Sequence, residues 1–504
     1  LTLHTYENDT SQKIGKAQVL LNSAGQIERL PDGQIDLTNA VQDAFGYNGF
    51  ADDPDPYNVN VNNEGYEEVE TWGTSLTITK DWEKFSLTSV TGYNDIEREL
   101  YIDFDFSPNT LGENGVRDEA EHFSQELRLT YDNGDNLSAI GGLYYFDGKT
   151  QSDARFGWFG FLYPRLQHIQ DTESWAVFAQ ATYEINDKLS ITPGIRYTDE
   201  KKDFWIRSDF LAQQFVPAFF SKDTGVGSTP VIPETTDSES WGEVSGKFTI
   251  DYQATEDVLV YLSWSHGFKS GGYRLPTTRA DLGGTTIDPE NLDAWELGLK
   301  TAWMENRLQF NLSAFYYDYT DLHVFSLNSS DIGADFVVEN ADSATLYGLE
   351  AELTAYPVEG LEIYLNLGWL PEAEYDEFIF DPAGAAEDLS GARMQFTPKY
   401  DMSAVVQYRR PVGPGALRGR VEYSRQGSSY SSPTQQDRLN VGGHFLTDAA
   451  LAYEFNDQYE IEVWVRNLTD EDHEVLYVDI EGFGFDMVNF TDPRTWGVTF
   501  RADF

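Results

Sequence analysis

Residues 360–369, Gly360-Leu-Glu-Ile-Tyr-Leu-Asn-Leu-Gly-Trp369, alternate between apolar and polar side chains. Successive side chains of a β-strand point to opposite faces, so the alternation predicts a strand with two different faces. One face holds Leu361, Ile363, Leu365, Leu367 and Trp369, and the other holds Glu362, Tyr364, Asn366 and Gly368. The first face suits lipid and the second suits water, which is typical of a strand in an outer-membrane β-barrel.

The same alternation recurs along the whole chain and predicts an all-β, antiparallel transmembrane barrel with about eighteen visible strands. The expected strands are residues 1–7, 69–80, 83–95, 120–131, 137–149, 172–185, 188–202, 240–252, 257–269, 291–303, 306–319, 335–356, 360–370, 394–410, 415–429, 444–456, 458–467 and 494–504.

The connectors between these strands are short and long by turns. Short ones such as Asp81-Trp82, Asn186-Asp187 and Asn456-Asp457 carry residues that favour tight turns. The long ones cover residues 8–68, 96–119, 150–171, 203–239, 270–290, 320–334, 371–393, 430–443 and 468–493. Outer-membrane barrels place short turns in the periplasm and long loops outside, so the pattern predicts the direction of every strand.

The composition agrees with a barrel and disagrees with a helical membrane protein. The chain is 24% charged and contains no run of eighteen apolar residues, whereas a barrel strand needs an apolar residue only at every second position. Aromatic residues make up 14%, as expected if rings gather at the two membrane interfaces. A large secreted β-sandwich is the alternative.

The chain has no cysteine, which excludes disulfides and thiolate metal sites. It begins with Leu1 and shows no basic segment followed by an apolar one, so we expect that any export signal is missing or already removed.

The last strand shows the clearest local alternation. Trp496, Val498, Phe500, Ala502 and Phe504 alternate with polar or small residues, and the chain stops on Phe504. A carboxyl-terminal Phe on such a strand resembles the signal read by the outer-membrane insertion machinery.

Several stretches between about residue 69 and residue 504 are similar to the barrel of TonB-dependent receptors, the energised outer-membrane transporters. They are Trp72-Gly-Thr-Ser-Leu76, Ser89-Val-Thr-Gly-Tyr93, Phe123-Ser-Gln-Glu-Leu-Arg-Leu129, Gly142-Leu-Tyr-Tyr-Phe146, Gly267-Phe-Lys-Ser-Gly-Gly-Tyr273, Pro289 to Lys300, Asn340-Ala341 with Tyr347-Gly-Leu-Glu350, Val465-Arg-Asn-Leu-Thr-Asp470 and Pro493-Arg-Thr-Trp-Gly497. Each is a strand or turn signature, so the resemblance concerns the scaffold and not the substrate.

The resemblance implies a barrel of twenty-two strands that follows a globular plug, through which the TonB energy-coupling complex acts. Nothing before residue 69 resembles a plug, and about four strands are absent. We therefore expect residues 1–504 to be the barrel domain of a protein whose plug and first strands are not in this sequence. A complete barrel of eighteen strands, which would enclose an open channel, is the alternative.

The net charge of −51 predicts acidic loops and an acidic lumen, because lipid-facing positions tolerate charge poorly. Nucleic acid is a disfavoured partner. No cofactor is expected, although two acidic runs, Asp52-Asp53-Pro54-Asp55 and Asp470-Glu471-Asp472, offer oxygen ligands for Ca²⁺. Neither run has the spacing of a defined calcium loop, and surface solubility is the simpler interpretation.

Two groups of residues are candidates for ligand contact. The expected loop 150–171 is rich in rings and offers Trp158, Phe159, Tyr163, Arg165 and His168 for stacking on a flat or sugar-like ligand. The alternative is that these rings cover the barrel mouth or belong to the interface girdle. A second ring-rich segment contains Phe204 and Trp205.

The other candidates are Lys269, Tyr273 and Arg274, on a Gly-rich turn. Arginine offers a fixed fork to a carboxylate or phosphate, and a structural pair with a loop carboxylate is the alternative. The seven histidines, His168 among them, show no metal-ligand spacing. No hydrolase motif occurs, so enzyme activity is not expected.

Three functions remain at this point. The first is active uptake of a scarce nutrient, and the resemblance implies a ferric siderophore, another metal chelate, cobalamin or an oligosaccharide as cargo. The second is a passive porin, and the third is an outer-membrane enzyme. All three place the chain in the bacterial outer membrane, in contact with its lipid.

Overall fold

The computed structural model describes residues 2–10, 16–20, 57, 63–103, 112–158, 163–211, 228–276, 279–330, 333–381, 386–456, 458–480 and 485–503. One antiparallel sheet of eighteen strands dominates this part of the chain. Its strands are β1 (Thr2–Thr10), β3 (Tyr66–Asp81), β4 (Phe85–Asp103), β5 (Gly112–Asp132), β6 (Leu137–Trp158), β7 (Pro164–Asn186), β8 (Leu189–Leu211), β9 (Ser228–Thr255), β10 (Val258–Lys269), β13 (Glu290–Trp303), β14 (Leu308–Ser330), β15 (Gly333–Ala355), β16 (Leu361–Glu377), β19 (Tyr400–Val412), β20 (Gly415–Gln426), β23 (His444–Phe455), β24 (Tyr459–Arg466) and β27 (Thr495–Ala502).

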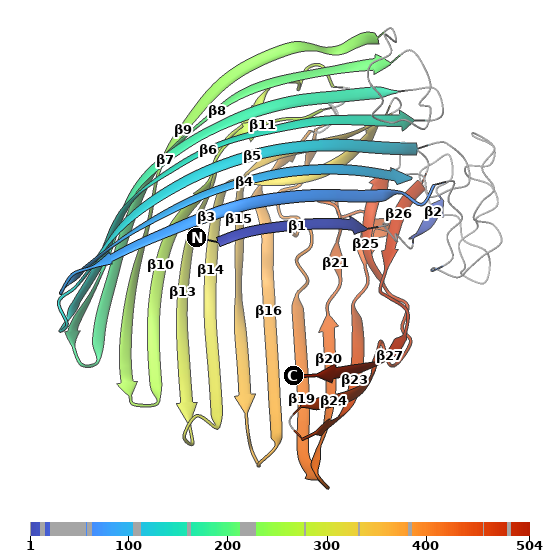
Figure 1. Ribbon diagram of the computed structural model, residues 1–504. Coiled ribbons are helices and arrows are strands. Elements are labelled where there is room, and N and C mark those ends of the chain that lie inside the picture. The colour runs from blue at the N-terminus through green and yellow to red at the C-terminus, as the bar shows by residue number, and fades with distance from the viewer. Residues whose placement is uncertain are drawn as a thin grey trace.

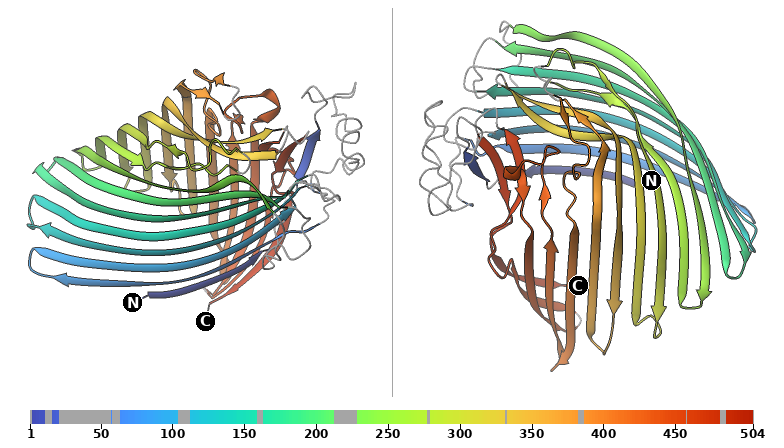
Figure 2. Two further views of the ribbon diagram at one scale, coloured as in Figure 1. Left: turned by 90° about the horizontal axis from the view of Figure 1, so that it is seen from above. Right: turned by 180° about the vertical axis from the view of Figure 1, so that it is seen from behind.

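Each strand of the sheet pairs with the next one along the chain, from β1 to β27. Figure 1 shows β3 to β9 side by side in a curved wall that continues through β10 to β24. Seen from above, the wall curls around a central space (Figure 2). β1 and β27 are its two edges, and no register joins them within the described residues.

The expected strands are confirmed, because each of them overlaps one strand of this sheet. The two-faced pattern of residues 360–369 is also confirmed. Leu365, Leu367 and Trp369 of β16 are exposed on the outside of the wall, where lipid would surround them. The total of twenty-two strands stays a prediction.

Aromatic side chains form a girdle on the outer face of the wall. Trp72 packs on Tyr93, Phe123 on Tyr145 and Trp175 on Tyr197, with ring centroids 5.2, 6.5 and 5.4 Å apart. Trp264 of β10 and Trp295 of β13 continue the girdle at the same level, and their ring centroids are 6.3 Å apart. Rings of this kind favour the membrane–water interface, so the girdle marks the upper limit of the lipid-facing band.

The short connectors are confirmed as tight turns. Gly360 closes the turn between β15 and β16 with a φ of +80°, and a Cβ there would lie 2.0 Å from the carbonyl oxygen of Arg409. Only glycine fits this position without strain. Asn456 closes the turn between β23 and β24 at a φ of +53°, a conformation that asparagine tolerates better than most residues.

The expected long connectors at 96–119, 150–171, 203–239 and 320–334 are wrong as loops, since most of their residues belong to strands. β6 runs to Trp158 and β7 begins at Pro164, so residues 150–158 and 164–171 are paired strand. Above the girdle neither face of the wall meets the hydrocarbon core of the membrane, so alternation of apolar and polar residues is not required there. The strand signal that we used therefore disappears from the sequence where the strand leaves the membrane.

The remaining long connectors carry short elements. β11 (Gly272–Tyr273) pairs with β12 (Thr286–Ile287), and β17 (Ile379–Phe380) pairs with β18 (Glu387–Asp388). β21 (Ser429–Tyr430) pairs with β22 (Asn440–Val441) beside the 3₁₀ turn η1 (Asp437–Leu439), while β2 (Lys16–Leu20), β26 (Phe485–Phe490) and β25 (Glu474–Ile480) form a three-stranded sheet.

These elements enclose two small apolar cores outside the membrane-spanning band. One contains Tyr375 and Phe378, and the other contains Leu439 and Val488. In the residues that the structure describes, no helix is long and apolar enough to cross a bilayer.

Candidate functional site on the inner wall

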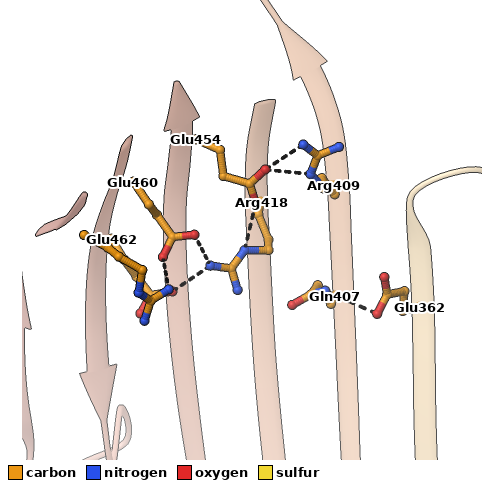
Figure 3. Close-up of polar contacts among 8 residues, drawn as sticks. Glu362, Gln407, Arg409, Arg418, Glu454, Glu460 and Glu462 are labelled. Atoms are coloured by element: carbon orange, nitrogen blue, oxygen red, sulfur yellow. Dashed lines mark hydrogen bonds and ion pairs between the residues drawn. The ribbon is translucent and has the colours of Figure 1, made fainter. Parts of the chain in front are cut away.

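The inner face of β19 to β27 carries a network of arginines and glutamates, because every second residue of these strands points away from the lipid (Figure 3). Arg418 lies at its centre. Its Nη2 is 2.7 Å from Glu460 Oε2 and 3.3 Å from Glu462 Oε2, and its Nε is 3.4 Å from Glu454 Oε1. Arg409 Nη2 lies 2.6 Å from Glu454 Oε2. The network thus joins four neighbouring strands.

Polar contacts continue along the same face on both sides. Arg501 of β27 lies 3.1 Å from Glu460. On the other side, Gln407 Nε2 donates to Glu362 at 3.3 Å, and the Tyr364 hydroxyl donates to the same carboxylate at 3.0 Å. The inner wall can therefore bind a polar body inside the barrel through charge-assisted hydrogen bonds.

Three rings stack on the inner face near the barrel mouth. His168 of β7 lies 6.4 Å from Phe204 of β8, and Phe204 lies 4.3 Å from Tyr273 of β11 with an angle of only 3° between the ring planes. Phe204 and Tyr273 are buried. The structure therefore brings together residues of both candidate groups and of the second ring-rich segment, which lie more than 100 residues apart in the sequence.

The stack holds a strap, residues 270–276 and 279–289, against the inner wall. Lys202 Nζ donates to Ser270 Oγ at 2.9 Å and to the Gly271 carbonyl at 2.6 Å. At its other end, the amide side chain of Asn340 on β15 exchanges two 3.0 Å hydrogen bonds with the backbone of Asp288. The strap thus bridges from β8 to β15 across the strands between them.

Arg274, which belongs to this strap, also helps to hold it in place. Its Nε donates to the Val338 carbonyl at 3.0 Å, and its Nη1 donates to Thr285 Oγ1 at 3.2 Å and to the Thr286 carbonyl at 3.0 Å. These partners differ from the loop carboxylate that we expected as the structural alternative. Lys269 is exposed at the end of β10.

The Tyr273 hydroxyl is buried and makes no hydrogen bond of normal distance and angle among the described residues, although the Asp237 carboxylate lies close to it. Burial raises the pKa of this hydroxyl, and the nearby charges of Asp237 and Glu239 raise it further. We expect Tyr273→Phe to leave the free energy of unfolding unchanged or to increase it by up to about 1 kcal/mol, because the substitution removes an unsatisfied buried group. Urea unfolding in lipid vesicles measures the change. Tyr66→Phe is the matched control, since the Tyr66 hydroxyl donates to Glu99 and its loss should destabilise by about 1 kcal/mol. A clear loss of stability in Tyr273→Phe would contradict this view of the stack.

His168 should make the barrel mouth sensitive to acid. Burial lowers the pKa of its imidazole, and the facing carboxylate of Asp118 offsets this only in part. The unfolded chain then takes up a proton near pH 6.5 while the folded chain does not, so stability is full above about pH 6.5 and falls as the pH decreases toward the folded pKa. Urea unfolding at pH 7.5 and pH 5 should show a smaller loss in His168→Gln than in the natural protein. His444→Gln, a half-buried histidine at the start of β23, is the control; an equal effect of both substitutions would refute the assignment.

The other candidates from residues 150–171 lie in several environments. Arg165 points to the outer face of the wall, opposite to His168, and binds Asp153 through Nε at 2.8 Å and Nη2 at 2.7 Å. Burial alone would raise the pKa of Asp153, but hydrogen bonds from Arg165 and Arg155 outweigh it and hold that pKa below its usual value. Tyr163 is buried, Trp158 ends β6, and Phe159 lies outside the described residues.

The acidic runs proposed for Ca²⁺ are described only in part. Asp52, Asp53 and Asp55 lie outside the described residues. In the second run, Asp470 pairs with Arg494 at 2.7 Å and Asp472 accepts from Tyr57 at 2.8 Å, so these two carboxylates have different partners. Within the described ranges, no three acidic or histidine side chains are placed to hold a metal ion. Calcium binding stays a prediction.

Comparison with known families identifies the family of this barrel. The family described as "TonB dependent receptor-like, beta-barrel" matches residues 11–468. The chain belongs to this family. It is a family of transporters and receptors rather than of enzymes, and its barrels are Gram-negative outer-membrane proteins.

Relatives of the receptor barrel carry names that refer to pesticin and to ferric-pyoverdine. The pesticin receptor of Yersinia enterocolitica is 23% identical over 386 residues, which cover 75% of this chain and 51% of the relative. The ferric-pyoverdine M114 receptor PbuA of Pseudomonas sp. (strain M114) is 21% identical over 350 residues, 68% of this chain and 37% of the relative. The chain thus spans about half or less of the length of these relatives.

Solved structures share the fold. The ferric yersiniabactin uptake receptor FyuA from Yersinia pestis superposes with a TM-score of 0.74 at 18% identity, covering 91% of this chain and 65% of that one. The siderophore receptor PiuA from Acinetobacter baumannii gives a TM-score of 0.69 at 15% identity, covering all of this chain and 71% of the other.

The arginine–glutamate network of the receptor barrel is the feature that the sequence analysis missed. Arg418, Glu454, Glu460 and Glu462 occupy the polar positions of alternating strands, which we interpreted only as water-facing. Their pairing depends on which residues of neighbouring strands lie opposite one another. The signal in the sequence is that charged residues occupy alternate positions of the last strands, which does not identify their partners.

Proposed function

We propose that the full-length protein takes up a ferric chelate across the outer membrane, driven by the TonB energy-coupling complex. The main support for this proposal is the match of residues 11–468 to the receptor-barrel family. The names of the relatives, which include pesticin, ferric-pyoverdine and ferric yersiniabactin receptors, support an iron chelate over cobalamin or an oligosaccharide. The polar inner wall supports a barrel whose lumen is filled by protein and water rather than by an apolar ligand.

The ligand side of the proposal concerns the barrel mouth. The rings of His168, Phe204 and Tyr273 and the strap they hold shape the inner surface that an incoming chelate meets. Because Phe204 and Tyr273 are packed against each other, we assign them to the support of that surface. Of the remaining candidates, Lys269 offers an exposed cation at the same rim.

Uptake measurements in cells test the proposal. A strain that lacks the gene encoding this chain should lose uptake of radioactive iron from at least one member of a panel of ferric siderophores, and the intact gene should restore it. An uncoupler that discharges the proton gradient should abolish the restored uptake. Uptake that survives the uncoupler would favour the passive porin. Induction of the gene on polysaccharide but not under iron limitation would favour an oligosaccharide as cargo.

A further inference from the structure

The outer face of β6 to β9 continues above the aromatic girdle. Lys149, Asp171, Asp203 and Ser238 lie directly opposite one another in a single row across these four strands. Asp171 is four residues beyond the girdle residue Trp175 on β7, which corresponds to about 13 Å along the strand. With the usual strand tilt Asp171 lies about 10 Å above the girdle, and Trp205, eight residues beyond the girdle residue Tyr197 on β8, lies about 20 Å above it, in the zone that the sugars of an outer-leaflet glycolipid occupy.

A hollow of about 680 Å³ opens on this outer face. Its lower edge is the polar row, and its upper part is formed by the next row, which contains Ile169, Trp205 and Thr236. Trp205 is half-buried, so one part of the indole packs against the wall and another part is available to a ligand. Seven of its nine lining residues have side chains on the outer face, and the other two, Phe204 and Asp237, alternate with them along β8 and β9. The hollow therefore faces away from the lumen, and the sheet separates it from the cargo path.

Several polar groups in the hollow have no protein partner within the described ranges. In the part of the chain that the structure describes, neither Lys149 nor Asp171 forms an ion pair, although they face each other, and the Trp205 indole N–H makes no hydrogen bond. Asp203, by contrast, is fixed: Lys201 Nζ lies 2.8 Å from its Oδ2, and Ser238 Oγ donates to its Oδ1 at 2.6 Å. The hydrogen bond from Lys201, followed by that from Ser238, holds the pKa of Asp203 below its usual value, so it stays an acceptor.

An apolar ring beside separate donors and acceptors suits a sugar. The C–H face of a pyranose packs on an indole, while its hydroxyls bind carboxylates, hydroxyls and ammonium groups. A phosphate fits less well, since Lys149 and Lys201 are balanced by Asp171 and Asp203, and a phosphate site needs an excess of positive charge.

We propose that this hollow binds a neutral sugar of an outer-leaflet glycolipid, the class of lipid to which lipopolysaccharide belongs. The position of the hollow on the outer face is the reason for choosing a glycolipid, and not a soluble glycan, as its ligand. A headgroup anchored in the surrounding leaflet is held at the level of the hollow at high effective concentration, whereas a soluble glycan would have to displace it. The proposal requires that the barrel stands in the outer membrane, and it does not depend on the identity of the cargo.

Binding of defined glycolipids to the full-length protein tests the proposal. The protein is freed of bound lipid and titrated with lipopolysaccharide that carries core sugars, with lipid A that lacks them, and with the soluble core oligosaccharide. Native mass spectrometry gives the apparent Kd for each. Trp205→Ala should weaken binding of the lipopolysaccharide about tenfold, and Trp205→Phe, which keeps an apolar ring, should weaken it less.

Asp171→Ala, which removes an exposed acceptor without disturbing packing, should also weaken binding of the lipopolysaccharide. Trp72→Ala is the matched control, because it removes an exposed tryptophan of the same outer face outside the hollow and should leave the Kd unchanged. Unchanged binding in both Trp205→Ala and Asp171→Ala would overturn the proposal. Equal affinity for lipid A would mean that the hollow binds the phosphorylated anchor and not the sugar. Equal affinity for the soluble oligosaccharide would mean that the lipid anchor is not needed for binding. Each of these outcomes also overturns the proposal.

Discussion

Leu365→Arg is expected to destabilise the barrel by about 2–4 kcal/mol, because it places a charge on the lipid face near the middle of the membrane-spanning band. Leu365 lies on β16 between the turn at Gly360 and the exposed Trp369, and its side chain is exposed on the outer surface. The positive charge would have to reach the headgroups or draw water into the hydrocarbon. Urea unfolding in phospholipid vesicles measures the loss, and heat-modifiable migration on gels reports the folded fraction.

The neighbouring residue supplies the control. Asn366 lies one position further along β16 and points into the lumen, where its amide donates to Ser403 at 3.0 Å. Asn366→Arg should cost no more than about 1 kcal/mol, the value of one exposed hydrogen bond. Equal destabilisation by both arginines would mean that the two faces of this strand do not separate lipid from water.

Arg418→Ala is the second large effect, with an expected loss of about 2 kcal/mol. The substitution leaves Glu454, Glu460 and Glu462 close together without the cation that joins them. The magnitude is below that of a fully buried pair, because the Arg418 side chain is 20% exposed. Urea unfolding in vesicles again measures the change, and raising the salt concentration should reduce the difference from the natural protein by screening the three carboxylates.

Arg420→Ala is the control for this prediction. Arg420 is two residues along the same strand and faces the same lumen, but among the described residues its ion pair is with Glu422 alone, and both side chains are more than 40% exposed. We expect a loss of about 0.5 kcal/mol. If the two alanine variants unfold alike, the network around Arg418 contributes no more than an ordinary surface pair.

The membrane-spanning part of the fold was predictable because the solvent changes across each strand. Lipid on one side and water on the other impose period two on the sequence, and stretches such as residues 360–369 show it directly. The turns at Gly360 and Asn456 were predictable for a related reason, since a left-handed backbone favours very few residue types. Family resemblance in the same strands led to the correct scaffold.

The extensions above the membrane were not predictable in this way. Residues 112–119 and 150–158 are strand, yet neither of their faces meets the hydrocarbon core, and no alternation marks them. The ring-rich segment 150–171 was therefore interpreted as a loop with exposed rings. In the structure Phe156 and Tyr163 are buried, and Arg165 and His168 lie on opposite faces of the wall.

The sequence by itself determined which residues face lipid, where the wall turns and which family the barrel belongs to, because each of these follows from local chemistry repeated along the chain. The tertiary structure alone decided that His168, Phe204 and Tyr273 form one stack, that Arg418 joins three glutamates, and that Trp205 lies in a hollow beside Asp171. These groupings depend on the register between strands and on where a strap folds back against the wall. Such long-range pairings leave no periodic trace in one sequence.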